Sequence, residues 1–171
     1  MKIIVLGYMA SGKSTIGKEI SKKLELNFID LDAYISEREK TSISEIFKTK
    51  GEIYFRKMES IYLKELLNFE EDFVLSLGGG TPCYANNMEL IHSSKAKSIY
   101  MQASIPTLAS RLIEEKSKRP LVSDLENDKI SEFVAKHLFE RSFFYEQAAL
   151  TLNTENKSIA EIVSEINLAL N

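Results

Sequence analysis

Residues 1–20 read MKIIVLGYMASGKSTIGKEI, and this stretch decides the fold. Residues 2–6 are almost purely apolar, which predicts a short buried β-strand. Gly7 follows the strand, and Gly12-Lys13-Ser14-Thr15 leads into apolar residues at helical spacing. Two glycines and a lysine directly after a strand are typical of a loop that binds a phosphate group. The stretch therefore predicts a strand, a phosphate-binding loop and a helix, in that order.

The loop, residues 7–14, matches the Walker A pattern of two glycines with four residues between them, followed by Lys and Ser. Its glycines let the backbone curl so that N–H groups point at phosphate oxygens, and the helix that starts near Ser14 adds its positive dipole end. Lys13 can reach the β- and γ-phosphates, and the Ser14 hydroxyl can ligate Mg²⁺. The alternative is a glycine turn beside a surface lysine. The position between a predicted strand and a predicted helix favours a nucleoside triphosphate site.

Length and composition predict one domain, residues 1–171. The chain has 171 residues, of which 44% are hydrophobic, enough for one core. Its net charge is −3 and it has no Lys/Arg-rich block, so we expect no nucleic-acid partner. The single cysteine, Cys83, cannot form an internal disulfide, which fits a reducing cytoplasm. No signal peptide precedes residues 2–6 and no apolar run approaches the ~18 residues of a membrane helix, so we expect a soluble cytoplasmic protein.

Five short apolar runs predict strands, and the segments between them have helical spacing. The predicted strands are residues 2–6, 27–30, 73–77, 98–102 and 149–152. Residues 107–113 and 158–170 show the clearest helical pattern, with Pro106 in the first turn of one and Ser158 as the N-cap of the other. Such alternation predicts an α/β fold with a five-stranded parallel sheet covered on both faces. Ligands then bind beyond the carboxyl ends of the strands.

Two carboxylates follow the second predicted strand, Asp30 and Asp32. One of them can hold a water on Mg²⁺, and the other can accept a proton or hydrogen bond from a substrate hydroxyl. The alternative is that Asp32 only caps a helix beginning near Ala33. The place after a strand in a phosphate-binding fold favours a functional role.

Two separated arginines lie on predicted helices. Arg56 can pair with Glu52 or Glu59 at helical spacing, and Arg141 precedes three aromatic residues, 143–145, that we expect to pack. The segment around Arg56 is expected to bury Ile53, Met58 and Ile61. Two guanidinium groups that faced one cleft would suit a carboxylate, although spacing along the sequence does not show that they converge.

The third predicted strand ends in three glycines, residues 78–80. A tight turn needs one or two glycines, so three favour a ligand that contacts main-chain N–H groups. His92, His137 and Cys83 show no metal-ligand spacing or partner, and no role is assigned to them.

Residues 114–128, EEKSKRPLVSDLEND, are charged and polar with few large apolar residues, which predicts a mobile lid. Lys116 and Lys118 are expected to be solvated. Arg119 is held before Pro120, and a closing segment often brings an arginine onto a transferred phosphate.

Taken together, these residues resemble shikimate kinase, a P-loop small-molecule kinase similar in fold to the nucleoside monophosphate kinases. The resemblance covers nearly the whole chain. It depends on six motifs in family-like order: GYMASGKST (7–15), FIDLD (28–32), FRKMES (55–60), SLGGGTP (76–82), KRPLV (118–122) and ERSFFYEQA (140–148). It implies a three-layer P-loop kinase fold with a substrate-binding segment at about 32–61 and a lid at about 114–128.

The resemblance also implies an activity and a set of site residues. The activity is ATP- and Mg²⁺-dependent phosphorylation of shikimate to shikimate 3-phosphate, a step of aromatic amino-acid biosynthesis, by an enzyme expected to be a monomer. The implied ATP-binding residues are Ala10, Ser11, Gly12, Lys13, Ser14, Thr15 and Arg119. The implied shikimate-binding residues are Asp32, Arg56, Gly79, Gly80 and Arg141. Asp32, Lys13 and Arg119 would be catalytic, and Ser14 and Asp30 would hold Mg²⁺, Asp30 through water.

Three positions depart from the family pattern. The family usually has glycine where Ala10 stands, which is tolerable if Ala10 keeps a negative φ. An arginine expected near adenine would fall at Leu112, whereas Arg111 lies one residue earlier. The second adenine-flanking loop is matched only loosely by residues 153–157.

Other functions remain open from the sequence. A gluconate kinase shares the loop and the fold, and a nucleoside monophosphate kinase would also use arginines in its acceptor pocket. A nucleotide-binding module without turnover is the alternative outside enzymes. The intact set of Lys13, Ser14, Asp32 and Arg119 disfavours that last alternative.

Overall fold

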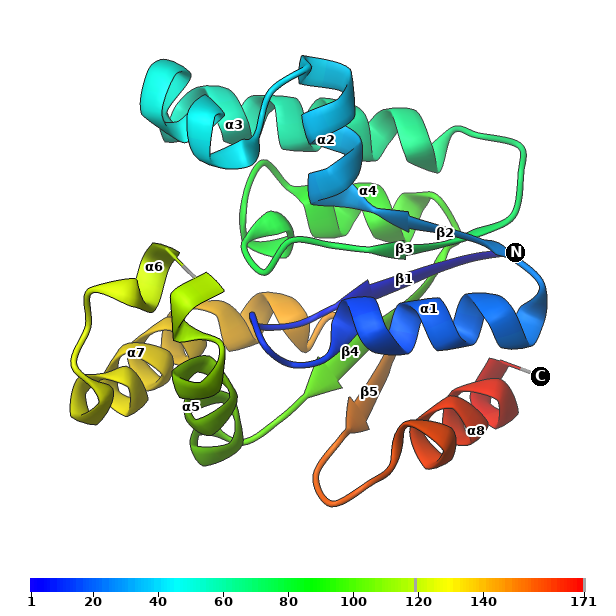
Figure 1. Ribbon diagram of the computed structural model, residues 1–171. Coiled ribbons are helices and arrows are strands. Elements are labelled where there is room, and N and C mark those ends of the chain that lie inside the picture. Colours follow the sequence, from blue (N-terminus) through cyan, green and yellow to red (C-terminus); the bar gives the residue numbers. More distant parts are fainter. Residues whose placement is uncertain (119, 171) are drawn as a thin grey trace.

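The computed structural model describes residues 1–118 and 120–170, and their strands form one parallel sheet. In these residues the sheet has five strands in the order β2-β3-β1-β4-β5 (Figure 1). The strands are β1 (Lys2–Leu6), β2 (Asn27–Asp30), β3 (Phe73–Ser76), β4 (Lys97–Gln102) and β5 (Leu150–Asn153). Each begins and ends within one residue of its predicted position, and all neighbouring pairs are parallel. The predicted α/β class is confirmed.

Helices cover both faces of the sheet (Figure 1). Ile3 and Val5 of β1 pack with α1 (Lys13–Leu24) and α8 (Ile159–Leu170). Ile4 and Leu6 face the larger core on the opposite side. The helices of that side are α2 (Leu31–Glu39), α3 (Ile43–Leu67), α4 (Asn87–Ser93), α5 (Ile105–Glu114), α6 (Pro120–Ser123) and α7 (Asn127–Tyr145). Because both faces are buried, β1 is a continuous apolar run instead of an alternating one.

Local sequence explains where several helices begin. The Ser104 hydroxyl accepts a hydrogen bond from Thr107 N at the start of α5, whose first turn holds Pro106. Ser158 caps α8 in the same way, accepting from Glu161 N. Helix α1 differs, because its N-cap is Gly12 and no side chain of the described residues caps it. Its first N–H groups are therefore available to an anion.

Helix α3 is kinked at Gly51, whose φ of 84° and ψ of 172° are not helical. After the kink the buried face carries Phe55, Glu59 and Leu63. The expectation that Ile53 and Ile61 are core residues was wrong, since they are 89% and 46% exposed. The reason is that α3 turns a carboxylate and an arginine inward, so its apolar spacing indicated the wrong face. Met58, the third residue of that expectation, is partly buried.

The described part of the predicted lid contains a 3₁₀ turn, Lys116–Lys118, and the short helix α6. Val122 of α6 is fully buried in the core and Leu125 packs against it. This segment is thus better anchored than its polar composition predicts. Arg119 lies outside the described residues. Within residues 1–118 and 120–170, no helix has the length and apolar character needed to cross a membrane.

Candidate active site

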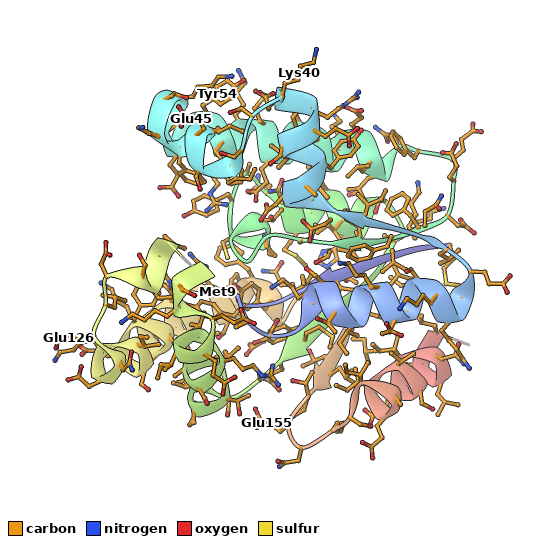
Figure 2. All side chains as sticks on the ribbon, viewed as in Figure 1. Met9, Lys40, Glu45, Tyr54, Glu126 and Glu155 are labelled. Atoms are coloured by element: carbon orange, nitrogen blue, oxygen red, sulfur yellow. The ribbon has the colours of Figure 1, made fainter. Side chains whose placement is uncertain are left out.

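A cavity of about 900 Å³ lies at the carboxyl ends of the strands and gathers the predicted site residues. Met9, labelled in Figure 2, marks the phosphate-binding loop at the end of β1, and Glu45 and Tyr54 mark α3 above it in that view. The cavity is lined by Ala10, Ser11, Gly12, Lys13, Ser14, Thr15, Asp30, Asp32, Arg56, Gly79, Gly80 and Arg141. Every predicted site residue that the structure describes therefore borders one cavity.

The phosphate-binding loop turns through three residues with positive φ: Gly7 (142°), Ala10 (62°) and Gly12 (92°). Gly7 is required, because a Cβ there would lie 2.8 Å from the Met101 carbonyl oxygen. The condition that Ala10 keeps a negative φ is wrong. Its left-handed conformation costs about 1–2 kcal/mol for a residue with a Cβ. A hydrogen bond from the Arg111 guanidinium to the Ala10 carbonyl, 3.1 Å long, helps to hold it.

Lys13 is almost buried, with 8% of its surface exposed. Its Nζ donates to the Tyr8 carbonyl at 2.7 Å. That bond folds the Lys13 side chain back over the loop. A cation and a helix N-terminus without a side-chain cap, on one concave surface, are the donor set that polyphosphate requires.

Ser14 and Asp30 lie in direct contact. The Ser14 hydroxyl donates to Asp30 Oδ2 at 3.0 Å, and Ser76 Oγ lies 3.3 Å from Ser14 Oγ. Asp30 Oδ1 also accepts from Ala33 N, so Asp30 is the N-cap of α2. The helix therefore begins at Leu31, and the alternative that Asp32 caps a helix at Ala33 is wrong. The sequence reasoning missed Ser76, although its place at the end of β3 was a usable signal.

Asp32 lies in the first turn of α2 and faces the cavity. Burial, together with the neighbouring carboxylates of Asp30 and Glu59, raises the pKa of Asp32 to about 6, against the opposing charges of Lys13 and Arg56. Asp32 is thus a carboxylate poised near neutral pH, which suits a group that exchanges a proton with a substrate.

The glycines after β3 let polar side chains approach the backbone. A Cβ on Gly78 would lie 3.2 Å from Asp32 Oδ1 and 3.3 Å from Glu59 Oε1, and one on Gly80 would lie 2.7 Å from Arg56 Nη2. A Cβ on Gly79 would meet Met9 N at 3.3 Å. Side chains at these positions would push the walls of the cavity apart.

Arg56 is held in place by acidic and aromatic neighbours. Its Nη1 donates to Glu59 Oε2 at 2.9 Å, and its guanidinium lies 4.2 Å from the centre of the Tyr84 ring. Glu59 is 1% exposed and accepts from Thr81 Oγ1 at 2.6 Å. Arg56 therefore pairs with Glu59 and borders the cavity at the same time. The sequence indicates Glu59 only as an ion-pair partner of Arg56, because spacing along a helix does not show that the Glu59 carboxylate is buried.

Arg141 reaches the cavity from α7. Its guanidinium lies 5.8 Å from the centre of the Tyr8 ring. Tyr145, one turn later, is fully buried and donates to the Gly79 carbonyl at 2.6 Å. Phe143 is 71% exposed, so the expectation that all three aromatic residues pack is wrong for this one. Arg56 and Arg141 converge on one cavity from two helices.

The cavity is also lined by Arg111, Thr154 and Lys157. Two residues of the predicted adenine loop, residues 153–157, thus border the cavity. Glu155, labelled in Figure 2, fixes this loop by accepting from Ser104 N at 2.7 Å and from Thr107 Oγ1 at 2.9 Å.

Comparison with known proteins identifies the family. The sequence model of the family described as shikimate kinase matches residues 9–171. A shikimate kinase of Flavobacterium johnsoniae is 48% identical over 165 residues, which are 96% of each chain. The crystal structure of a shikimate kinase from Bacteroides thetaiotaomicron has a TM-score of 0.92 at 36% identity, covering 99% of this chain and 98% of that one.

Two further structures bear on the substrate alternatives. A shikimate kinase from Acinetobacter baumannii, solved in complex with shikimate, has a TM-score of 0.87 at 26% identity and covers 99% of this chain and 92% of that one. A gluconokinase from Sinorhizobium meliloti has a TM-score of 0.58 at 16% identity, over 99% of this chain and 90% of that one, a likeness that shows the fold alone. With its sequence match, its relatives and its cavity in agreement, the chain belongs to the shikimate kinase family.

Proposed function

We propose that the chain transfers the γ-phosphoryl group of ATP to the 3-hydroxyl of shikimate, using the cavity residues described above. The observation that carries the proposal is the shared cavity, because it joins a polyphosphate-binding loop, a carboxylate with a raised pKa and two convergent arginines. The complex of the Acinetobacter baumannii relative with shikimate supports the choice of acceptor. The weaker likeness to a gluconokinase gives no reason to prefer gluconate as the acceptor.

ATP would place its phosphates in the loop of residues 7–14, against the first N–H groups of α1. Lys13 would supply positive charge to the β- and γ-phosphates. Arg111, Thr154 and Lys157 would border the adenosine. Arg119 remains predicted as the lid arginine that reaches the transferred phosphate.

Ser14 and Asp30 fit a magnesium site. Both are oxygen ligands, and the 3.0 Å between Ser14 Oγ and Asp30 Oδ2 places them on one side of the loop. No cluster of three or more acidic, His or Cys side chains able to hold a metal occurs in residues 1–118 and 120–170. A site with few protein ligands suits Mg²⁺, which keeps waters and substrate phosphates in its shell. Bound there, the ion would neutralise charge on the phosphates and orient them.

Asp32 would accept the hydrogen bond, and then the proton, of the attacking hydroxyl. With a pKa of about 6, most of this carboxylate is ionised at pH 7 and able to act as a base. The hydroxyl oxygen would bond to the γ-phosphorus as the bond to the ADP oxygen breaks. Lys13 would hold the leaving phosphate as its negative charge grows.

Arg56 and Arg141 would bind the shikimate carboxylate from opposite sides, with Gly79 and Gly80 forming the floor between them. Guanidinium forks match a carboxylate in both charge and geometry. Their separate anchors, Glu59 and the Tyr8 ring, hold them before the substrate binds. Binding at the carboxylate end would direct the ring hydroxyls toward Asp32 and the phosphate-binding loop.

We also propose that residues 1–171 act as one kinase domain, as a monomer in the cytoplasm, without nucleic-acid or membrane partners. The net charge of −3 and the lone Cys83 support this proposal. Light scattering of the purified protein tests the monomer, because a mass near twice 19.4 kDa would contradict it.

The carboxylate assignment can be tested with an analogue of shikimate in which a neutral amide replaces the carboxylate. Wild-type enzyme should discriminate strongly against the amide in kcat/KM, and Arg56→Ala should discriminate much less. Arg38→Ala is the matched control, because Arg38 pairs with Glu65 on the surface of α2 and α3, away from the cavity. Equal discrimination by wild type and Arg56→Ala would remove Arg56 from the carboxylate site.

A further inference from the structure

Tyr8, in the phosphate-binding loop, contacts both the nucleotide side and the acceptor side of the site. Its ring is 1% exposed. Its carbonyl accepts from Lys13 Nζ at 2.7 Å and from Ser11 N at 3.2 Å. Its hydroxyl makes a hydrogen bond 2.9 Å long with Nδ1 of His137 on α7. One residue thus joins the loop that holds Lys13 to the helix that carries Arg141.

Two successive turns of α7 contact the phosphate-binding loop, and the next turn contacts the glycines after β3. Residues four apart on a helix lie on the same face, so His137, Arg141 and Tyr145 form one row. His137 bonds the Tyr8 hydroxyl, Arg141 lies over the Tyr8 ring, and Tyr145 bonds the Gly79 carbonyl. Arg141 is therefore the middle of the row, with a hydrogen bond anchoring the helix on either side of it.

The ionisation states favour this contact at neutral pH. Burial raises the pKa of the Tyr8 phenol to about 12, so the hydroxyl keeps its proton. Burial and the charges of Arg141 and Lys136 lower the pKa of His137, against the opposite effect of Glu140. A neutral imidazole protonated on Nε2 accepts the Tyr8 hydroxyl proton at Nδ1.

We propose that Tyr8 and His137 are a pair of positioning residues, whose hydrogen bond fixes α7 against the phosphate-binding loop and so holds Arg141 at the shikimate carboxylate. The proposal rests on the role given to Arg141 in the proposed function. Neither Tyr8 nor His137 lines the cavity, so they act through Arg141 and not on the reacting atoms. Loss of this hydrogen bond would leave the Tyr8 ring in place, but His137 would no longer anchor its end of the row on α7.

The test is Tyr8→Phe, which removes the hydroxyl and keeps the ring beneath Arg141. A net hydrogen bond is worth about a threefold to tenfold change in an equilibrium, so the KM for shikimate should rise about threefold to tenfold. The KM for ATP and kcat should change less than twofold. His137→Leu should have the same effect, and the double variant should be no worse than either single variant.

A conservative variant separates positioning from general loss of packing. His137→Asn keeps an amide oxygen near the place of Nδ1 and should restore most of the shikimate KM. Tyr34→Phe is the matched control, because the Tyr34 hydroxyl donates to Glu65 between α2 and α3, away from α7 and outside the cavity, and its KM values should match the wild type. Additive effects of Tyr8→Phe and His137→Leu, or equal rises in both KM values, would overturn the proposal.

The amide analogue separates this proposal from the proposed function. Tyr8→Phe should weaken the use of shikimate but leave the use of its amide unchanged, since the amide has no carboxylate for Arg141. If wild type prefers shikimate to the amide and Tyr8→Phe keeps that preference in full, only the positioning role is overturned. No discrimination by wild type would overturn the carboxylate assignment and the positioning role with it.

Discussion

Asp32→Asn should remove activity and at the same time stabilise the ligand-free protein. The variant keeps the shape of the side chain and removes its charge. As loss of a positioned general base, it should lower kcat by roughly 10² or more, with little change in ATP affinity. The gain in stability follows from the raised pKa of the wild-type carboxyl, which means that the folded protein holds the ionised form poorly.

The size of the gain follows from the two pKa values. Asp32 has a pKa of about 6 in the folded protein and 3.8 ordinarily, so the folded state binds the proton more tightly. Between about pH 4 and pH 6 the unfolded chain has released the proton while the folded protein still holds it. The free energy of unfolding therefore falls as the pH rises through this range. At about 1.4 kcal/mol per pKa unit, ionised Asp32 costs roughly 2–3 kcal/mol at pH 7–8 and under ~1 kcal/mol near pH 4. Asparagine avoids this cost.

Urea unfolding of wild type and Asp32→Asn at pH 4 and pH 8 measures the effect. The variant should be more stable at pH 8 by roughly 2–3 kcal/mol, and the difference should shrink to under ~1 kcal/mol at pH 4. Asp128→Asn is the control, because Asp128 is exposed in the first turn of α7 and is not among the charges that act on Asp32, so no gain is expected at either pH. An Asp32→Asn variant no more stable than wild type at pH 8, or equally stabilised at both pH values, would refute the reasoning.

Three further variants test the loop and the kinked helix. Lys13→Ala should weaken ATP binding and abolish turnover, because it removes a charge from the phosphates, and near wild-type values in titration and assay would contradict the loop assignment. Ala10→Gly should raise the free energy of unfolding by up to about 1 kcal/mol. Glycine relieves the strain of the left-handed conformation, and this gain exceeds the cost of the added freedom of the unfolded chain. A lower free energy of unfolding would contradict this expectation. Gly51→Ala should lower the free energy of unfolding by about 1–3 kcal/mol. Backbone strain is the only cause, because a Cβ at this position meets nothing within 4 Å. An unchanged urea midpoint would contradict this expectation.

The sheet and the phosphate-binding loop could be predicted from the sequence because their signals are local. Each strand is a short apolar run, and in a parallel sheet buried on both faces such runs stand out against the helical spacing between them. Gly12 meets a backbone requirement, a φ of 92°, that arises within the loop itself. Asp30 and Asp32 follow β2 directly, so the carboxyl-edge rule placed them without knowledge of the packing.

The parts that failed depend on contacts between distant segments. The buried face of α3 could not be found from apolar spacing, because Glu59 is buried by a hydrogen bond from Thr81 and a pair with Arg56. The positive φ of Ala10 depends on the whole loop. His137 was given no role, since its partner Tyr8 lies 129 residues away in sequence. Long-range pairs of this kind leave no periodic signal.

In the proposed function, one cavity joins ATP to a carboxylate-bearing acceptor whose hydroxyl faces Asp32. The most direct measurement is ADP release by the purified protein with ATP and Mg²⁺ and, in turn, shikimate, gluconate and AMP. Rapid ADP release with shikimate alone, with one shikimate phosphate formed for each ADP, is the predicted result. Faster release with gluconate or AMP than with shikimate would contradict the account.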